Sequence, residues 1–390
     1  MGLISVALDG SLENTGLKEK YMPMIKILAD SLYRCYAYDF PTTITSEIAG
    51  FQSKECKVSF PMWYARFFVN PIRKFFRLPD YYVYFYRHHM TDYLYSKKIK
   101  DDKSSIIFCS VLNQKMILNA KSAGKIVVVE AGNSEPEREY QKIIREYDKF
   151  KIKRRYIYGD SRYKNICKTG LENADWIITI SEVSKKTYID AGYDMNKFKT
   201  IYLTGTDFPI RTIPNRGRKA FISTAFHSFI KGTHRLLLAW RKANINNIPL
   251  IIVGRLCDDM KEFIKTYGPF QNVRYVGFQG DLRSWYQDYD AVGVLMSLSE
   301  GAVRTTPEMM SFGFPMITSP DATCDIVKDG ENGYIIESDN EDGLAERLRW
   351  FAEDWDRVHA MRANVLMSVS RRTVSDYSCE LAQFMLSICN

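Results

Sequence analysis

Residues 221–253, FISTAFHSFIKGTHRLLLAWRKANINNIPLIIV, decide the fold class of this protein. The runs 221–225 and 250–253 are short and mostly apolar, as strands buried on both faces are. Between them, residues 234–243 show the pattern of an amphipathic helix. A strand, a helix and a second strand in this order predict a parallel sheet with helices packed on its faces.

The same alternation continues on both sides of this stretch. We expect further strands at 4–8, 106–109, 126–129, 176–180, 199–203, 273–276, 291–296, 315–318 and 334–336. We expect helices at 21–32, 114–123, 137–147, 183–191, 282–286 and 307–312, and in three closing stretches around 341–352, 355–369 and 376–388. The segment 204–218 has no period and contains Gly205, Pro209, Pro214 and Gly217, which is typical of a linker.

This pattern predicts an α/β protein with two Rossmann-like, doubly wound domains, residues 1–205 and 206–375. Two such domains face each other across a cleft lined by the carboxyl ends of their strands. Open α/β sheets bind ligands at those strand ends, so the cleft is the expected ligand site.

Length and composition agree with this division and exclude other classes of protein. The chain has 390 residues, 46% of them hydrophobic and 26% charged, which excludes a disordered, collagen-like or coiled-coil protein. No run approaches 18 apolar residues, and residues 1–10 lack a basic stretch before a long apolar run. We therefore expect neither a membrane span nor a secretion signal. The eight cysteines form no CxxC pair, as in cytoplasmic proteins with reduced thiols.

The positive charge lies in the first half of the chain. Residues 1–200 contain 33 basic and 23 acidic side chains, a balance of +10, which leaves 21 and 23, or −2, for residues 201–390. Between residues 60 and 77, basic side chains alternate with aromatic ones. Three interpretations fit: a helical hairpin with core aromatics and solvated charges, a membrane-surface contact, or nucleic-acid binding. Of the two partners we favour peripheral membrane contact through residues 60–90 and expect no nucleic acid.

The segment 299–315, SEGAVRTTPEMMSFGFP, combines features of a ligand site. It predicts a helix with Thr306 as N-cap, Pro307 at the first position and Glu308 in the first turn. Glu300 on the preceding loop then shares one mouth with Glu308 and with free backbone N–H groups. Such a site suits an anionic ligand that carries hydroxyls, because the N–H groups bind phosphate and carboxylates accept from sugar hydroxyls. The alternative is that Glu308 merely offsets the helix dipole.

A lysine lies at the same edge of the predicted sheet. The strand 221–225 leads through His227-Ser228-Phe229-Ile230-Lys231-Gly232-Thr233 into a helix, which places Lys231 at a strand-to-helix turn. An ammonium group there reaches a diphosphate as a point charge. Together with Glu300 and Glu308, it makes a diphosphate clamp.

These features occur in an order that resembles a known family. Glu300 and Glu308 with seven residues between them, Gly313-x-Pro315, the turn 325–333 and Lys231-Gly232 are similar to the C-terminal domain of the family 4 retaining glycosyltransferases of the GT-B fold. The resemblance covers roughly residues 215–388. A weaker one links residues 173–182 and Gly192 to the last strand and helix of that family's N-terminal domain.

The resemblance implies a role for each matching residue. Glu308 would bond the ribose of a nucleotide sugar, and Lys231 would neutralise the departing diphosphate. Residues of the intervening loop would hold the donor with Glu300, and residues after the strand 273–276 would lie by the base; these are Gly301, Ala302, Val303, Arg304 and Thr305, and Gly277 and Phe278. Residues 376–390 would return as a helix to the first, acceptor-binding domain.

The activity that the resemblance implies is transfer of a sugar from a UDP- or GDP-linked donor with retention of configuration and without a metal or other cofactor. The basic, aromatic segment favours a saccharide or lipid-linked acceptor in surface polysaccharide synthesis, at the inner face of the cell membrane. Two alternatives are a nucleotide-sugar epimerase of the same architecture and an inactive nucleotide-sugar-binding partner subunit.

The sequence also departs from the family pattern. An arginine usual five residues before Lys231 is Phe226, so Arg304, Arg255 or His227 would have to supply the missing cation. Val303 replaces a second glycine, which stiffens the loop. Glu135 occupies the position expected to meet the reacting sugar and is a candidate catalytic residue; the alternative is a Glu in the first turn of the next helix.

No metal site is expected. The five histidines show no metal-ligand spacing. The two D-x-D strings, 288–290 and 354–356, are most simply solvated carboxylates.

Overall fold

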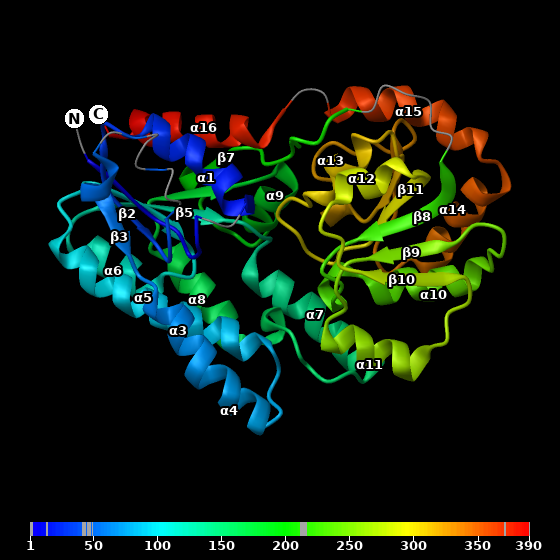
Figure 1. Ribbon diagram of the computed structural model, residues 1–390, viewed down its shortest axis with the longest axis horizontal. Coiled ribbons are helices and arrows are strands. Elements are labelled where there is room, and N and C mark those ends of the chain that lie inside the picture. The colour runs from blue at the N-terminus through cyan, green and yellow to red at the C-terminus, as the bar shows by residue number, and fades with distance from the viewer. Residues whose placement is uncertain are drawn as a thin grey trace.

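The computed structural model describes residues 3–12, 15–40, 44, 48, 50–210, 217–369 and 372–389. Within these residues, two parallel sheets lie side by side, each covered by helices (Figure 1). The first has seven strands in the order β3-β2-β1-β4-β5-β6-β7, and the second has six in the order β10-β9-β8-β11-β12-β13. The predicted fold class, two doubly wound α/β domains, is confirmed. Residues 211–216 of the expected linker lie outside the described residues.

The first sheet and its helices span the N-terminal half of the chain. Its strands are β1 (Ile4–Ala7), β2 (Leu32–Ala37), β3 (Glu55–Lys57), β4 (Ile106–Ser110), β5 (Ile126–Ala131), β6 (Trp176–Thr179) and β7 (Phe198–Thr200). Its helices are α1 (Thr15–Ile27), α3 (Phe60–Tyr64), α4 (Asn70–Phe75), α5 (Tyr81–Lys98), α6 (Gln114–Ser122), α7 (Pro136–Phe150), α8 (Ser161–Glu172) and α9 (Glu182–Asp190).

The second sheet follows the linker. Its strands are β8 (Arg218–Thr224), β9 (Leu250–Val253), β10 (Val273–Gly277), β11 (Tyr289–Leu295), β12 (Met316–Thr318) and β13 (Gly333–Ile335). The helices are α10 (Thr233–Ala243), α11 (Asp258–Tyr267), α12 (Leu282–Gln287), α13 (Thr305–Met310), α14 (Glu341–Glu353), α15 (Asp356–Val369) and α16 (Val374–Ser387).

The sequence pattern was misleading at one edge of the first sheet. The helix predicted at 21–32 ends at Ile27, and Leu32 begins β2, which pairs in parallel with β1. Strands β2 and β3 were not predicted. Tyr33 and Arg34 interrupt the apolar run of β2 because they are only half-buried, so the local pattern does not distinguish this strand from the helix before it.

Helix α7 connects the two domains through its packing. It precedes the linker in sequence, but Ile143, Tyr147 and Phe150 at its C-terminal end belong to the hydrophobic core around the second sheet. Glu146 on the same helix bonds to His234 and Arg235 of α10. Burial alone would raise the pKa of Glu146, but these two partners lower it to about 2. Figure 1 shows α7 between the two sheets.

The closing helix α16 packs on the first domain, although the chain enters it from the second. Val374, Tyr377 and Leu381 lie in the core that includes β1 and α1. The Tyr377 hydroxyl donates to Glu130 at the end of β5, at 2.5 Å. The domains are therefore linked twice, by α7 and by the return of α16 (Figure 1).

Residues 60–98 form a helical hairpin whose first arm, α3 and α4, extends away from both sheets (Figure 1), while Tyr95 of α5 lies in a core of the first domain. The interpretation that its aromatic side chains form a core is wrong for the first arm, where Trp63 is 50% and Phe75 82% exposed. None of the helices in the described part of the chain has the length and apolar character needed to cross a membrane. All eight cysteines are free thiols.

Candidate active site

Lys231 and Glu300 meet at the carboxyl ends of two adjacent strands. Lys231 follows β8, Glu300 follows β11, and the two strands pair in parallel, so their ends share one edge. The Lys231 Nζ atom lies 2.5 Å from Glu300 Oε1. The Glu300 side chain is almost buried, at 8% exposure, whereas Lys231 is more accessible. The ammonium group is thus positioned at the mouth of the site and neutralises a buried carboxylate.

A glycine makes this approach of the two strand ends feasible. Gly232 has a φ of +63°, and an added Cβ would lie 1.7 Å from the Met296 carbonyl oxygen. Only glycine tolerates both that backbone angle and that contact. The Lys231-Gly232 pair therefore has a structural reason: the glycine packs against the segment after β11, and the lysine beside it reaches Glu300.

Glu308 lies on the short helix α13, whose start differs from the prediction. The N-cap is Arg304 instead of Thr306, and Pro307 is the third helical residue. The Thr306 hydroxyl cannot cap the helix because it donates to the Ala322 carbonyl at 3.0 Å. Burial raises the pKa of Glu308 to about 7, although Arg304 nearby acts in the opposite direction. Glu308 thus changes its charge near neutral pH.

The structure separates the three candidates for the missing cation. His227 is fully buried; its Nδ1 pairs with the Thr233 hydroxyl and its Nε2 with the Val253 carbonyl, both at 2.9 Å. Burial lowers the pKa of His227 to about 4, so it is neutral. The prediction that His227 supplies a cation is therefore wrong.

Two arginines are placed better than the histidine. Arg304 is the N-cap of Glu308's own helix, and its side chain is partly exposed, with Glu19 at 3.7 Å. Arg255 is 65% exposed and lies within 6.0 Å of the Phe226 ring. Arg255 and Phe226 line a cavity of about 400 Å³ between the domains. The guanidinium of Arg255 thus lies near Phe226, but it comes from the end of β9 and not from the end of β8.

Gly277 and Phe278 close the edge of the second sheet at the end of β10. Gly277 has a φ of +70°, which turns the chain away from the strand. The Phe278 ring is 81% exposed, so its face is open to stacking.

The loop from Leu298 to Gly301 is bonded by side chains of the first domain. Its carbonyl groups accept from Lys142 at 2.7 Å, from Ser134 at 2.8 Å and from Ser181. An added Cβ at Gly301 would lie only 2.1 Å from the Gly132 carbonyl oxygen, so the two domains touch through backbone here. Ala302 is half-buried beside this contact, while Val303 packs into the second core, which accounts for its replacement of a glycine.

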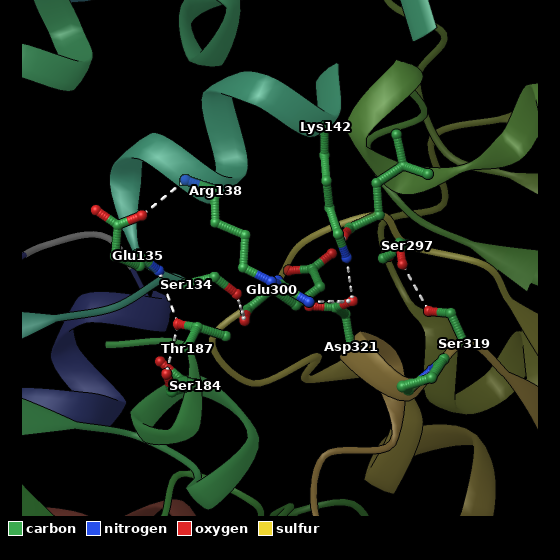
Figure 2. A network of polar contacts seen from close by, with 12 residues as sticks. Ser134, Glu135, Arg138, Lys142, Ser184, Thr187, Ser297, Glu300, Ser319 and Asp321 are labelled. Atoms are coloured by element: carbon green, nitrogen blue, oxygen red, sulfur yellow. Dashed lines mark hydrogen bonds and ion pairs between the residues drawn. The ribbon is translucent and has the colours of Figure 1, made fainter. Parts of the chain in front are cut away.

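One buried carboxylate fastens the two domains beside this loop. Asp321 accepts from Arg138 at 2.7 and 3.2 Å and from Lys142 at 2.7 Å, and it is only 5% exposed. Figure 2 shows Arg138 and Lys142 extending from α7 toward Asp321, with Glu300 close by. Sequence reasoning missed these residues. The signal that could have found them is the polar stripe at 135, 138, 139 and 142 on one face of α7.

Two more carboxylates of this stripe have different surroundings. Glu135 is the N-cap of α7 and accepts from the Arg138 backbone N–H at 2.7 Å (Figure 2). The alternative of a Glu at the start of the helix therefore describes what Glu135 does, and a role toward the sugar stays a prediction. Burial, and then the nearby Glu300, raise the pKa of Glu139 well above its usual value. Glu139 was not predicted as a site residue.

The site holds no arrangement of residues typical of a metal centre. Within the described ranges, no group of three or more His, Cys, Asp or Glu side chains is placed to bind one ion. We expected solvated carboxylates in the D-x-D string at 288–290, and this prediction is wrong for Asp290. Asp290 is buried in β11, where it accepts from Trp355, His359 and Arg362 and so attaches α15 to the sheet.

Comparison with known proteins agrees with this geometry. The family model "Glycosyl transferases group 1" matches residues 209–366, which make up most of the second domain. An "uncharacterized glycosyltransferase" of Haemophilus influenzae is 24% identical over 181 residues, which cover 45% of this chain. The chain spans about half the length of that curated relative.

Solved structures of other proteins share the fold over the whole chain. HepE of Anabaena, crystallised with UDP and glucose, has a TM-score of 0.65 and 16% identity and covers 99% of this chain and 100% of its own. Sucrose-phosphate synthase of Thermosynechococcus elongatus has a TM-score of 0.67 and 14% identity and covers 100% of this chain and 99% of its own. The fold is the GT-B fold of two facing Rossmann-like domains.

Proposed function

We propose that this protein is a retaining glycosyltransferase that moves a sugar from a UDP- or GDP-linked donor to a saccharide or lipid-linked acceptor without a metal ion. The second domain binds the donor and the first binds the acceptor. The observation that carries the proposal is the juxtaposition of Lys231, Glu300 and the helix of Glu308 at adjacent strand ends of the group 1 domain. The complex of HepE with UDP and glucose supports a nucleotide-sugar donor.

In this reaction the bond between the anomeric carbon and the diphosphate oxygen breaks, and its electron pair leaves with the diphosphate. The acceptor hydroxyl oxygen forms the new bond to that carbon, and its proton passes to the departing diphosphate. Stabilising the negative charge on the departing diphosphate is the largest contribution that the protein can make to lowering the activation barrier. Lys231 exchanges its contact with Glu300 for a contact with the phosphate, and Arg255 or Arg304 adds a second positive charge. Glu300 is then free to accept from a hydroxyl of the donor sugar.

A thermal-shift screen of nucleotides tests the proposal. UDP or GDP at about 100 times its Kd stabilises the fold by about 2.7 kcal/mol, and Lys231→Ala reduces the shift. Release of nucleotide from the matching sugar nucleotide must then require an acceptor. Release without any acceptor would indicate an epimerase, and nucleotide binding without turnover would indicate a binding subunit; either result contradicts the proposal. No shift with any nucleotide would contradict it as well.

We also propose that the acceptor is held at the cytoplasmic face of the cell membrane and that the first arm of the hairpin docks there. This arm, residues 60–77, carries eight exposed large apolar side chains: Phe60, Met62, Trp63, Phe67, Phe68, Ile72, Phe75 and Phe76. Arg66, Lys74 and Arg77 are exposed among them, and no acidic residue lies between Glu55 and Asp80. Aromatic side chains at headgroup level with basic neighbours suit an anionic lipid surface.

Vesicle sedimentation tests the membrane contact. The protein is expected to pellet with vesicles that contain phosphatidylglycerol and much less with phosphatidylcholine alone, because each basic residue near an anionic surface contributes about 1 kcal/mol. A Phe75→Ser, Phe76→Ser double variant should stay in the supernatant. Met195→Ser, at another exposed apolar position, is the matched control and should still pellet. Equal binding of the double variant and the control would contradict the contact.

A further inference from the structure

A cavity in the first domain lies beside the donor loop and does not include Lys231, Glu300 or Glu308, although Ser134 and Glu139 form part of its wall. It has a volume of about 250 Å³ and lies at the carboxyl ends of β1, β4 and β5. Asp9 and His88 line it from opposite parts of the chain: Asp9 follows β1, and His88 lies on α5 of the hairpin. The cavity is therefore at the ligand-binding edge of the first sheet.

The polar groups of this cavity are buried and only partly hydrogen-bonded by the protein. His88 is 9% exposed and the Asp9 side chain 10%. Asp9 Oδ1 accepts from Asn113 at 3.0 Å, whereas Asp9 Oδ2 and both ring nitrogens of His88 have no hydrogen-bond partner among the described residues. Asp9 Oδ2 and His88 Nδ1 are 3.3 Å apart. Buried polar atoms are nearly always hydrogen-bonded, so His88 Nε2 and the Asp9–His88 pair suit a ligand that offers both donors and acceptors.

The remaining wall suits a sugar ring. Five tyrosines and one phenylalanine line the cavity: Tyr21, Tyr84, Tyr158, Tyr163, Tyr188 and Phe108. Aromatic faces pack against the apolar C–H faces of a sugar, while a carboxylate accepts from its hydroxyls and an imidazole both donates and accepts. The volume lies just below the usual range for small-molecule sites, which fits one ring and excludes an oligosaccharide.

The cavity is continuous with the donor loop. Ser134 lines the cavity and donates to the Glu300 carbonyl at 2.8 Å. Glu139 also lines it, and its pKa is raised in part by Glu300. A ring that fills the cavity beside the Asp9–His88 pair would therefore present a hydroxyl toward the loop that faces Lys231. His88 and Tyr84 lie on α5, the second arm of the hairpin. The lipid part of a lipid-linked sugar would therefore extend along the first arm, which is proposed to contact the membrane.

We infer that this cavity binds the terminal sugar ring of the acceptor and that Asp9 and His88 are the residues that bind its hydroxyls. The inference rests on the proposed glycosyl transfer and adds the chemistry of its second substrate. It predicts that a single unphosphorylated sugar ring binds to this protein without any nucleotide.

Saturation-transfer NMR on the full chain tests this with a panel of methyl glycosides of glucose, galactose, mannose and N-acetylglucosamine. At least one should give a signal, and His88→Ala and Asp9→Asn should weaken its binding at least tenfold. Gly132→Leu fills the cavity, since an added Cβ at Gly132 meets only Glu130 Oε1 at 3.7 Å, and should abolish the signal. This variant also keeps the test decisive if His88→Ala does not fold.

Glu308→Gln is the matched control because it alters the donor site alone. It should weaken UDP binding and leave the glycoside signal unchanged. A signal that survives in Gly132→Leu, or no signal from any glycoside, overturns the inference even if UDP binds. Glycoside binding at His88 in a protein that binds no nucleotide would instead overturn the proposed function.

Discussion

Replacing Glu308 by Gln should stabilise the free protein and weaken its binding of nucleotide, and both effects follow from one half-buried carboxyl group. Burial raises the pKa of Glu308 from 4.5 to about 7. Each pKa unit corresponds to about 1.4 kcal/mol, so ionising Glu308 costs about 3 kcal/mol more in the folded than in the unfolded chain.

The sign of this effect fixes its pH dependence. Because the folded-state pKa is raised, the protonated group stabilises the fold; this contribution is complete below pH 4.5 and is lost as the pH rises through 7. Glutamine cannot ionise, so the stability of the variant does not fall as the pH rises through 7. Its melting temperature should match the wild type near pH 5 and exceed it by roughly 6–12 °C at pH 8.5.

Nucleotide binding should change in the opposite direction. A carboxylate that accepts from the ribose hydroxyls is worth about 1.5–3 kcal/mol, so Glu308→Gln should weaken UDP or GDP binding by roughly 10- to 150-fold at pH 8.5. Calorimetric titration and thermal melts between pH 5 and 8.5 measure both quantities. Glu346→Gln, at an exposed carboxylate of α14, should change neither. A melting difference that does not vary with pH would refute the role of burial, and unchanged nucleotide affinity would refute the ribose contact.

Other changes test the rest of the site. Lys231→Ala should lower kcat by about 10²–10³, since it removes a cation from the departing diphosphate, and a steady-state assay showing less than a tenfold loss would count against it. Gly301→Ala should separate the domains and abolish activity, because the added Cβ would lie 2.1 Å from the Gly132 carbonyl oxygen. Small-angle scattering should show a larger radius of gyration for this variant and the wild-type value for the control Gly132→Ala. Asp321→Asn should lower the free energy of unfolding by about 1–3 kcal/mol, a value reduced from that of a fully buried ion pair because Arg138 and Lys142 are partly exposed. The calorimetric unfolding transition should split into two, and a single transition at the wild-type temperature would contradict the role of Asp321. Activity should persist in excess EDTA, and its abolition with rescue by a divalent ion would contradict a metal-free mechanism.

The sequence predicted the elements whose signal is local. Runs such as 250–253 and the helical periods between them predict two doubly wound sheets, because strand and helix periodicity can be recognised over a few residues. The meeting of Lys231 with Glu300 also follows, since parallel strands that are neighbours bring their carboxyl ends to one edge. The edge strands β2 and β3, which are partly polar or very short, lacked this signal, and the helices α8 and α11 were not predicted either.

The state of each site residue could not be predicted in the same way. His227 was a reasonable cation by its position, but burial between β9 and α10 makes it neutral. Glu308 and Glu139 have raised pKa values because other segments remove water from them. The aromatic side chains of the hairpin are exposed because the arm that carries them extends away from both cores.

By itself, the sequence determined that this chain forms two facing α/β domains with two carboxylates and a lysine at the strand ends of the second. Only the tertiary structure decided that α7 belongs to both cores, that Asp321 fastens the domains, and that Asp9 meets His88 across 78 intervening residues. The reason is that charge, burial and pairing depend on which distant segments surround a side chain. Periodicity is set by the chain's own neighbours, whereas an electrostatic environment is set by the packed whole.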